Sequence, residues 1–164
     1  MKNRILICFI ALGLSFIVSG PAHAESGTSD ILLAGISTLT SIPMGDTIIT
    51  TSSTNGIVTF IRSSGGPFVE GASGNVQCAR FSRKTPSSFE LEADCVATFA
   101  PDETVQLLFK RKTGDVVAGT LGEGTLQLSG GTGHFAGVSG QCKYKVENLP
   151  GNWNVTTSKC QWTK

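Results

Sequence analysis

Four cysteines constrain what this chain can fold into, because their spacing is tied to turn signals. They are Cys78, Cys95, Cys142 and Cys160. The first two are centred on Pro86-Ser87, and the last two on Pro150-Gly151, a dipeptide typical of tight turns. Cysteines placed symmetrically about a turn face each other across a β-hairpin. The fifth cysteine, Cys8, lies in the N-terminal apolar run, so the other four allow three pairings. Of these, the spacing predicts Cys78–Cys95 and Cys142–Cys160.

Metal binding and thiol catalysis are the alternatives for these cysteines. The sequence has no C-x-x-C motif, and His134 is the only histidine after the N-terminal segment, so neither a zinc site nor a thioredoxin-like site is expected. We therefore predict structural disulfides, no metal and no cofactor. Each disulfide would close a loop of about 17 residues, which is worth about 3 kcal/mol in the chain-entropy model.

The N-terminal 24 residues have the three parts of a signal peptide. Lys2 and Arg4 precede an apolar run over residues 5–18, and Ala22-His23-Ala24 matches a small-x-small cleavage site. The run is short for a membrane span, which needs about 20 residues, so an uncleaved anchor is the weaker interpretation. We expect export to the periplasm or the medium, where disulfides persist.

The charge balance argues against two classes of partner. Removing the leader takes two of the 13 basic residues, which leaves 11 against 12 acidic residues and a net charge of −1. A nearly neutral chain lacks the excess of basic residues that would attract nucleic acids or anionic membranes. The local cluster Lys110-Arg111-Lys112 is interpreted as a solvated turn. No later apolar segment approaches spanning length, so no membrane span is expected after cleavage.

Alternation with a period of two indicates β-strands. From Phe89 to Phe99 the odd positions are apolar, whereas Glu90, Glu92 and Asp94 occupy the opposite phase. Residues 105–109 and 142–146 alternate similarly, and shorter β-rich runs cover 31–36 (as strand or short helix), 48–51, 57–61, 116–121, 125–128, 155–157 and 160–162. The segment Thr54-Asn55-Gly56 resembles a turn.

These runs predict an all-β fold, as a sandwich or a barrel, and closure into a barrel has the advantage of removing exposed edges. The runs amount to about eight to ten short antiparallel strands, which the two disulfides would hold together in pairs. The predicted organisation is a signal peptide over 1–24, an N-terminal arm over 25–45 and a barrel domain over 46–164.

The predicted hairpin between Cys78 and Cys95 contains one conflict. If the two cysteines are in register, Arg83 lies opposite Glu90, but Arg80 lies opposite Ala93 on the apolar phase. A β-bulge that shifts the register is the simpler interpretation. Otherwise Arg80 points into the barrel, where it could anchor a ligand.

A glycine-rich segment, residues 130–140, follows a predicted strand. It lacks the Lys-Ser/Thr of a phosphate-binding loop, so we interpret it as tight turns around a buried Phe135. The proposed turn residues are Gly131, Gly133, Phe135, Gly137 and Gly140. Together with residues 119–128, the segment resembles a signature of bacterial proteins similar to the allene oxide cyclase and dirigent barrel group. The resemblance covers about residues 46–147.

This resemblance implies a single closed antiparallel β-barrel of about eight strands with an apolar cavity, in which the family's enzymes cyclise or couple hydrophobic substrates. We therefore expect an all-β fold of this kind, with the two disulfides joining neighbouring strands. The catalytic positions of the family's enzymes match no residue here, so we expect noncatalytic binding of a small apolar ligand or of a partner protein. An isomerase or cyclase of a hydrophobic substrate and a structural envelope protein are the alternatives. The candidate ligand-lining residues are Arg80, Phe89, Leu91, Phe99, Leu107 and Phe109.

The remaining candidate groups have simpler structural interpretations. His134 is expected in an exposed turn, and the three carboxylates of residues 90–94 on a solvated strand face. The aromatic residues Tyr144, Trp153 and Trp162 could contact a ligand, although packing beneath the C-terminal disulfide is the simpler expectation.

Overall fold

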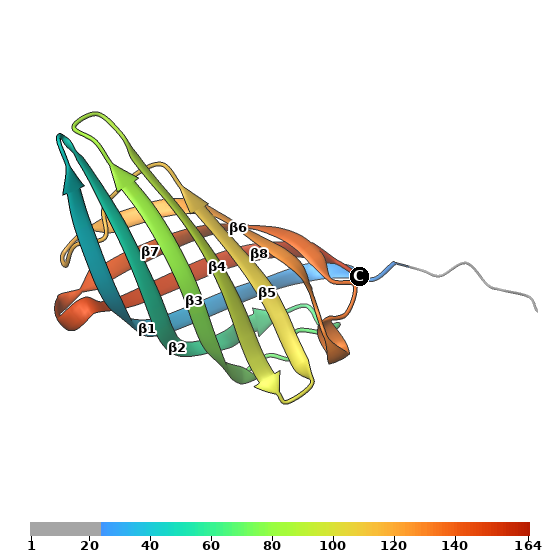
Figure 1. Cartoon of the computed structure of the whole chain (residues 1–164). Helices are drawn as coiled ribbons and strands as arrows, with labels where there is room; N and C mark the ends of the chain where they lie inside the picture. The colour runs from blue at the N-terminus through green and yellow to red at the C-terminus, as the bar shows by residue number, and fades with distance from the viewer. Residues whose placement is uncertain (1–23) are drawn as a thin grey trace, which may run out of the picture.

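Eight antiparallel strands form one closed barrel in the computed structural model, which describes residues 24–164 (Figure 1). Each strand pairs with the next in sequence, and β8 pairs with β1 to close the barrel. The signal-peptide prediction falls almost wholly on residues outside the described part. The strands are β1 (Ser26–Met44), β2 (Thr47–Ser63), β3 (Ser73–Lys84), β4 (Phe89–Ala100), β5 (Glu103–Arg111), β6 (Leu121–Gly131), β7 (Ser139–Leu149) and β8 (Trp153–Thr163). The all-β barrel predicted from the sequence is confirmed.

Both predicted disulfides are present. Cys78 lies directly opposite Cys95 in the β3–β4 hairpin, and Cys142 lies opposite Cys160 in the β7–β8 hairpin. The proline-containing turns expected between them connect those strands. Each disulfide therefore joins neighbouring strands of one hairpin, and barrel closure rests on the β1–β8 backbone pairing.

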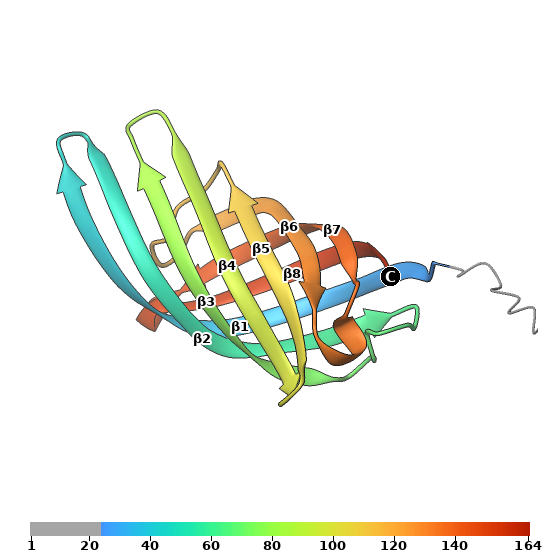
Figure 2. The ribbon, with the colours of Figure 1, turned by 45° about the vertical axis from the view of Figure 1, so that its right-hand side comes forward.

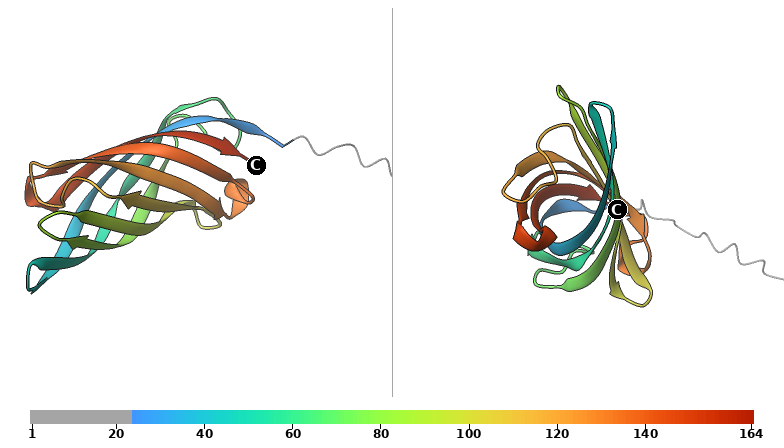
Figure 3. Two further views of the ribbon diagram at one scale, coloured as in Figure 1. Left: turned by 90° about the horizontal axis from the view of Figure 1, so that it is seen from above. Right: turned by 60° about the vertical axis from the view of Figure 1, so that its left-hand side comes forward.

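The assignment of residues 25–45 to an arm outside the barrel is wrong. Ser26–Met44 forms β1, which pairs with β2 along one edge and with β8 along the other. Its odd positions from Ser29 to Ser37 are buried, including Ile31 and Leu33. Glu25 and Lys164 exchange two backbone hydrogen bonds, so the start of the described chain lies beside the C-terminus (Figure 3). The alternation in this segment is the signal that the arm assignment overlooked.

Two further local predictions are corrected. Thr54-Asn55-Gly56 is no turn, because β2 continues through it and Gly56 lies opposite Gly35 of β1. Residues 116–120 form a loop, and β6 begins only at Leu121. The β1–β2 and β3–β4 hairpins extend beyond the neighbouring strands at one end of the barrel (Figure 2). At that end β8 pairs with β1 only as far as Ile36, whereas β2 pairs with β1 as far as Met44.

The barrel interior changes character along its length. One half is filled by aromatic rings from three strands and two loops, Phe60, Phe68, Phe99, Phe135 and Trp162. The 64–72 loop supplies Phe68, and a 3-10 turn, η1 (Gly133–Phe135), supplies Phe135. The other half buries polar side chains, among them Ser37, Thr54, Arg111 and Asn154. A buried polar half needs internal hydrogen bonds or a ligand to satisfy it.

Candidate binding cavity

A cavity lies within the polar half of the barrel. Its volume is about 40 Å³, enough for about three water molecules. Side chains from seven strands line it: Leu33, Thr54, Cys78, Arg80, Leu91, Ala93, Cys95, Phe109, Arg111, Tyr144, Val146, Asn154 and Thr156. The wall thus combines aliphatic and aromatic groups with two guanidinium groups and a phenol. No Asp or Glu is among these residues.

Arg80 points into the barrel. The β3–β4 register runs without a shift from Asn75–Thr98 to Lys84–Phe89, so the β-bulge that we favoured is wrong. Its guanidinium donates from Nε to Ser52 Oγ at 2.9 Å and from Nη2 to Ser37 Oγ at 2.6 Å. Burial and the positive charge of Arg111 lower the pKa of Arg80 to about 10. The side chain therefore still carries its charge at neutral pH.

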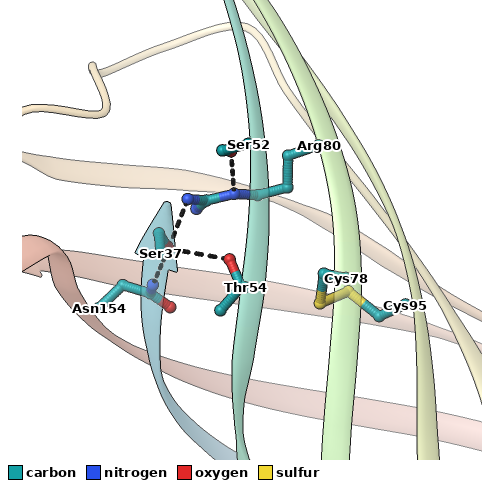
Figure 4. The surroundings of a disulfide bond; sticks show 7 residues. All are labelled: Ser37, Ser52, Thr54, Cys78, Arg80, Cys95 and Asn154. Atoms are coloured by element: carbon teal, nitrogen blue, oxygen red, sulfur yellow. Dashed lines mark hydrogen bonds between the residues drawn. A yellow bond between two sulfur atoms is a disulfide. The ribbon is translucent and has the colours of Figure 1, made fainter. Parts of the chain in front are cut away.

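Ser37 is the centre of the hydrogen-bond network that holds Arg80 (Figure 4). Its hydroxyl oxygen accepts from Arg80 and, at 3.0 Å, from Asn154 Nδ2. Because those two bonds occupy both lone pairs of the oxygen, the Ser37 proton is left to donate to Thr54 Oγ1, 2.9 Å away. The hydroxyl proton of Thr54, on the cavity wall, is then free to donate elsewhere.

Arg111 is also an interior residue, which corrects its interpretation as part of a solvated turn. Within the cluster of residues 110–112, Lys110 and Lys112 are exposed, whereas Arg111 is 4% exposed. Its guanidinium carbon lies 5.0 Å from the centre of the Phe89 ring, and Nη2 donates to the backbone oxygen of Asp115 at 2.6 Å. Nη1 is buried and has no hydrogen-bond partner among the described residues. Burial lowers the pKa of Arg111.

The period of two in the sequence indicated that Arg111 faces the barrel interior. Val105, Leu107, Phe109 and Arg111 follow one another at a spacing of two, and all four are buried on the inner face of β5. The adjacent lysines concealed this phase, because a run of three basic residues resembles a polar turn. The strand period therefore predicts the direction of Arg111 better than the local charge does.

Tyr144 completes the polar side of the cavity. It is 4% exposed, its ring packs edge-on against Phe109 with centroids 5.1 Å apart, and its hydroxyl makes no hydrogen bond to another described residue. Burial raises the pKa of Tyr144 to about 12, although the charges of Arg111 and Arg80 act in the opposite direction. The phenol is consequently neutral at physiological pH and can donate a hydrogen bond.

The predicted ligand-lining residues divide into two groups. Arg80, Leu91 and Phe109 line the cavity. Phe89 contacts the guanidinium of Arg111 instead of the cavity itself. Phe99 stacks on Phe60 in the aromatic half, 4.8 Å between centroids, and Leu107 is fully enclosed in the core. The predicted set omitted the other lining residues, among them Arg111, Tyr144 and Asn154.

The glycine-rich segment lies at the aromatic end, away from the cavity. Phe135 is 3% exposed and its ring is 5.1 Å from that of Phe99. Gly133 and Gly137, on either side of it, have φ angles of +57° and +79°, which side chains other than glycine strain to adopt. Gly131 and Gly140 lie in β6 and β7, where an added Cβ would fall 1.9 Å from Thr104 O and 2.6 Å from Gln161 O respectively.

The other candidates lie apart from the cavity. His134 is exposed, and its Nδ1 forms a hydrogen bond with the side chain of Glu103. Glu90, Glu92 and Asp94 face outward, and Lys110 pairs with Glu92 at 3.0 Å. Of the aromatic trio, Tyr144 lines the cavity, Trp162 packs on Phe68 and Trp153 is exposed, so the three do not form a group.

Across residues 24–164, no three His, Cys, Asp or Glu side chains are grouped so that they could hold a metal ion together. The same residues contain no helix with the length and apolar character that a membrane crossing needs.

Comparison of the whole chain with models of known families, with curated proteins and with solved structures gave no match.

Proposed function

We propose that this protein is an exported, noncatalytic binding protein whose barrel takes a small ligand into the cavity between β3, β5 and β7. The observation that supports it is a cavity with an apolar wall, Leu33, Leu91 and Phe109, beside Arg111, whose buried Nη1 has no hydrogen-bond partner among the described residues. The two disulfides and the signal-peptide sequence support export. The small volume restricts the enclosed part of the ligand to a few heavy atoms.

The titratable groups of the cavity favour binding over an isomerase or cyclase. A general base that works near pH 7 needs a pKa close to that value. The groups in the cavity wall that can titrate are Arg80, Arg111 and Tyr144, and the pKa of Tyr144 is raised to about 12. These groups can orient and polarise a ligand, but at neutral pH none of them accepts a proton readily.

A volume-filling substitution tests the proposal. Ala93 lines the cavity, whereas Ala79 on β3 is exposed on the outer face. We expect native mass spectrometry of the wild-type protein, purified mildly after export, to show a small bound molecule. Ala93→Val should lose that mass because its added methyl groups occupy the cavity, and Ala79→Val should keep it.

A further result would contradict the proposal. If the wild-type protein carried no bound mass and bound none of acetate, butyrate and 1-butanol saturably, the cavity would not be a ligand site. The same conclusion would follow if Ala93→Val and Ala79→Val retained the molecule equally.

A further inference from the structure

The cavity contains an excess of positive charge that the protein does not neutralise. Arg80 and Arg111 both line it, and no carboxylate does. Neither arginine forms an ion pair with an Asp or Glu within residues 24–164. Buried charges in proteins are normally paired, since removing an ion from water costs several kcal/mol in practice.

Asp115 has the carboxylate whose charge acts on the pKa of Arg111, but that carboxylate binds other groups. It forms an ion pair with Lys84 and accepts a hydrogen bond from the backbone N–H of Val116 at 2.7 Å. Asp115 meets the guanidinium of Arg111 through its backbone oxygen. The 112–120 loop therefore holds Arg111 in place but leaves its charge without a direct counterion.

The unmatched groups in the cavity are donors. Arg80 uses two of its five N–H groups on Ser52 and Ser37, and Arg111 leaves Nη1 without a partner. The neutral phenol of Tyr144 and the free hydroxyl proton of Thr54 add two further donors to the lining of the cavity. A group that satisfied them all would accept several hydrogen bonds and carry negative charge.

We propose that the cavity binds a small carboxylate, held between Arg80 and Arg111 with Tyr144 donating to it. Arginine is suited to this because its planar fork matches the two oxygens of a carboxylate. The volume of about 40 Å³ suits an acetate-sized group. This inference rests on the proposed function and specifies its ligand: the carboxylate lies at the polar wall and its alkyl group contacts Leu91 and Phe109.

Titration calorimetry with four probes at constant ionic strength tests this inference and the proposed function separately. The probes are acetate, butyrate, acetamide and 1-butanol, added to the protein purified after export of the full chain. We expect acetate and butyrate to bind saturably and acetamide at least tenfold more weakly. Equal binding of butyrate and 1-butanol would overturn the carboxylate inference while leaving the binding function intact. Binding of acetate without binding of butyrate would support the anion site and contradict the apolar part of the ligand.

A matched pair of variants on β3 gives the second arm. Arg80→Gln removes the inward charge, whereas Arg83→Gln removes an exposed arginine three residues away. We expect Arg80→Gln to weaken acetate binding at least tenfold and Arg83→Gln to leave it unchanged. Equal affinities of the two variants, or no saturable acetate binding by the wild type, would refute the inference.

A third measurement covers the case in which Arg80→Gln does not fold. In the wild-type protein, the Nε–Hε NMR signals of two arginines should shift on adding acetate and remain still on adding acetamide. Tyr144→Phe should weaken acetate binding while keeping both arginine responses. Arginine signals that acetate does not move would refute the site independently of any variant.

Discussion

Phe135 offers the sharpest test of how the barrel is closed at its aromatic end. Its ring lies 5.1, 5.6 and 6.0 Å from those of Phe99, Phe68 and Phe60, and the residue is 3% exposed. Phe81 provides a matched control, because it is 44% exposed on the outer face of β3. The same change, Phe→Ala, can therefore be made at a buried and at an exposed site.

The expected cost differs strongly between the two sites. A buried Phe→Ala change costs about 3–5 kcal/mol, because it loses transfer free energy and leaves a cavity among rings that cannot collapse freely. Each aromatic pair that is lost adds to this by about 0.5–1.5 kcal/mol beyond its buried area. At the exposed site we expect a loss of at most about 1 kcal/mol.

Equilibrium unfolding in urea measures both losses. The fluorescence of Trp162, whose ring lies 5.4 Å from that of Phe68, reports on the aromatic half directly. Phe135→Ala should lower the free energy of unfolding by at least about 2 kcal/mol more than Phe81→Ala does. Equal losses for the two variants would mean that Phe135 does not seal the barrel and that the packing argument is wrong.

Three further predictions concern the disulfides and the cavity. Replacing Cys142 and Cys160 together by alanine frees a loop with a sequence separation of 18 residues, and should cost about 3 kcal/mol in urea unfolding; a cost near zero would contradict it. In Gly122→Ala the new Cβ would fall 1.6 Å from Arg111 Nη1, so the guanidinium must move, and urea unfolding should show a loss of about 1–3 kcal/mol. Tyr144 ionises near pH 12 when folded and near pH 10 when unfolded, so the folded state holds the proton more tightly and this stabilisation is lost as the pH rises above 10. The stability of the wild type relative to Tyr144→Phe should therefore fall by about 1 kcal/mol between pH 9 and 11. The lowered pKa values of the nearby arginines change the stability in the opposite direction, but these arginines are present in both proteins. A difference in stability that does not depend on pH would contradict this prediction.

The predictions from sequence succeeded where they depended on short-range spacing. Cysteines placed symmetrically about a turn must meet if both flanks are strands, so Cys78–Cys95 and Cys142–Cys160 followed from local geometry. The alternation in residues 89–99 gave the inner and outer faces of β4. The predictions failed at β1, whose burial requires two neighbours, one of which, β8, is at the far end of the sequence.

The sequence alone determined the β-strand class, the two hairpin disulfides and the face on which most alternating residues lie, because each depends on neighbours within one hairpin. Only the tertiary structure decided that Arg80, Arg111 and Tyr144 share one cavity. These residues come from β3, β5 and β7, which do not pair with one another, and only the curvature of a closed barrel brings their inner faces together. Strand period specifies the direction of a side chain, inward or outward, but the register around the barrel specifies which side chains meet.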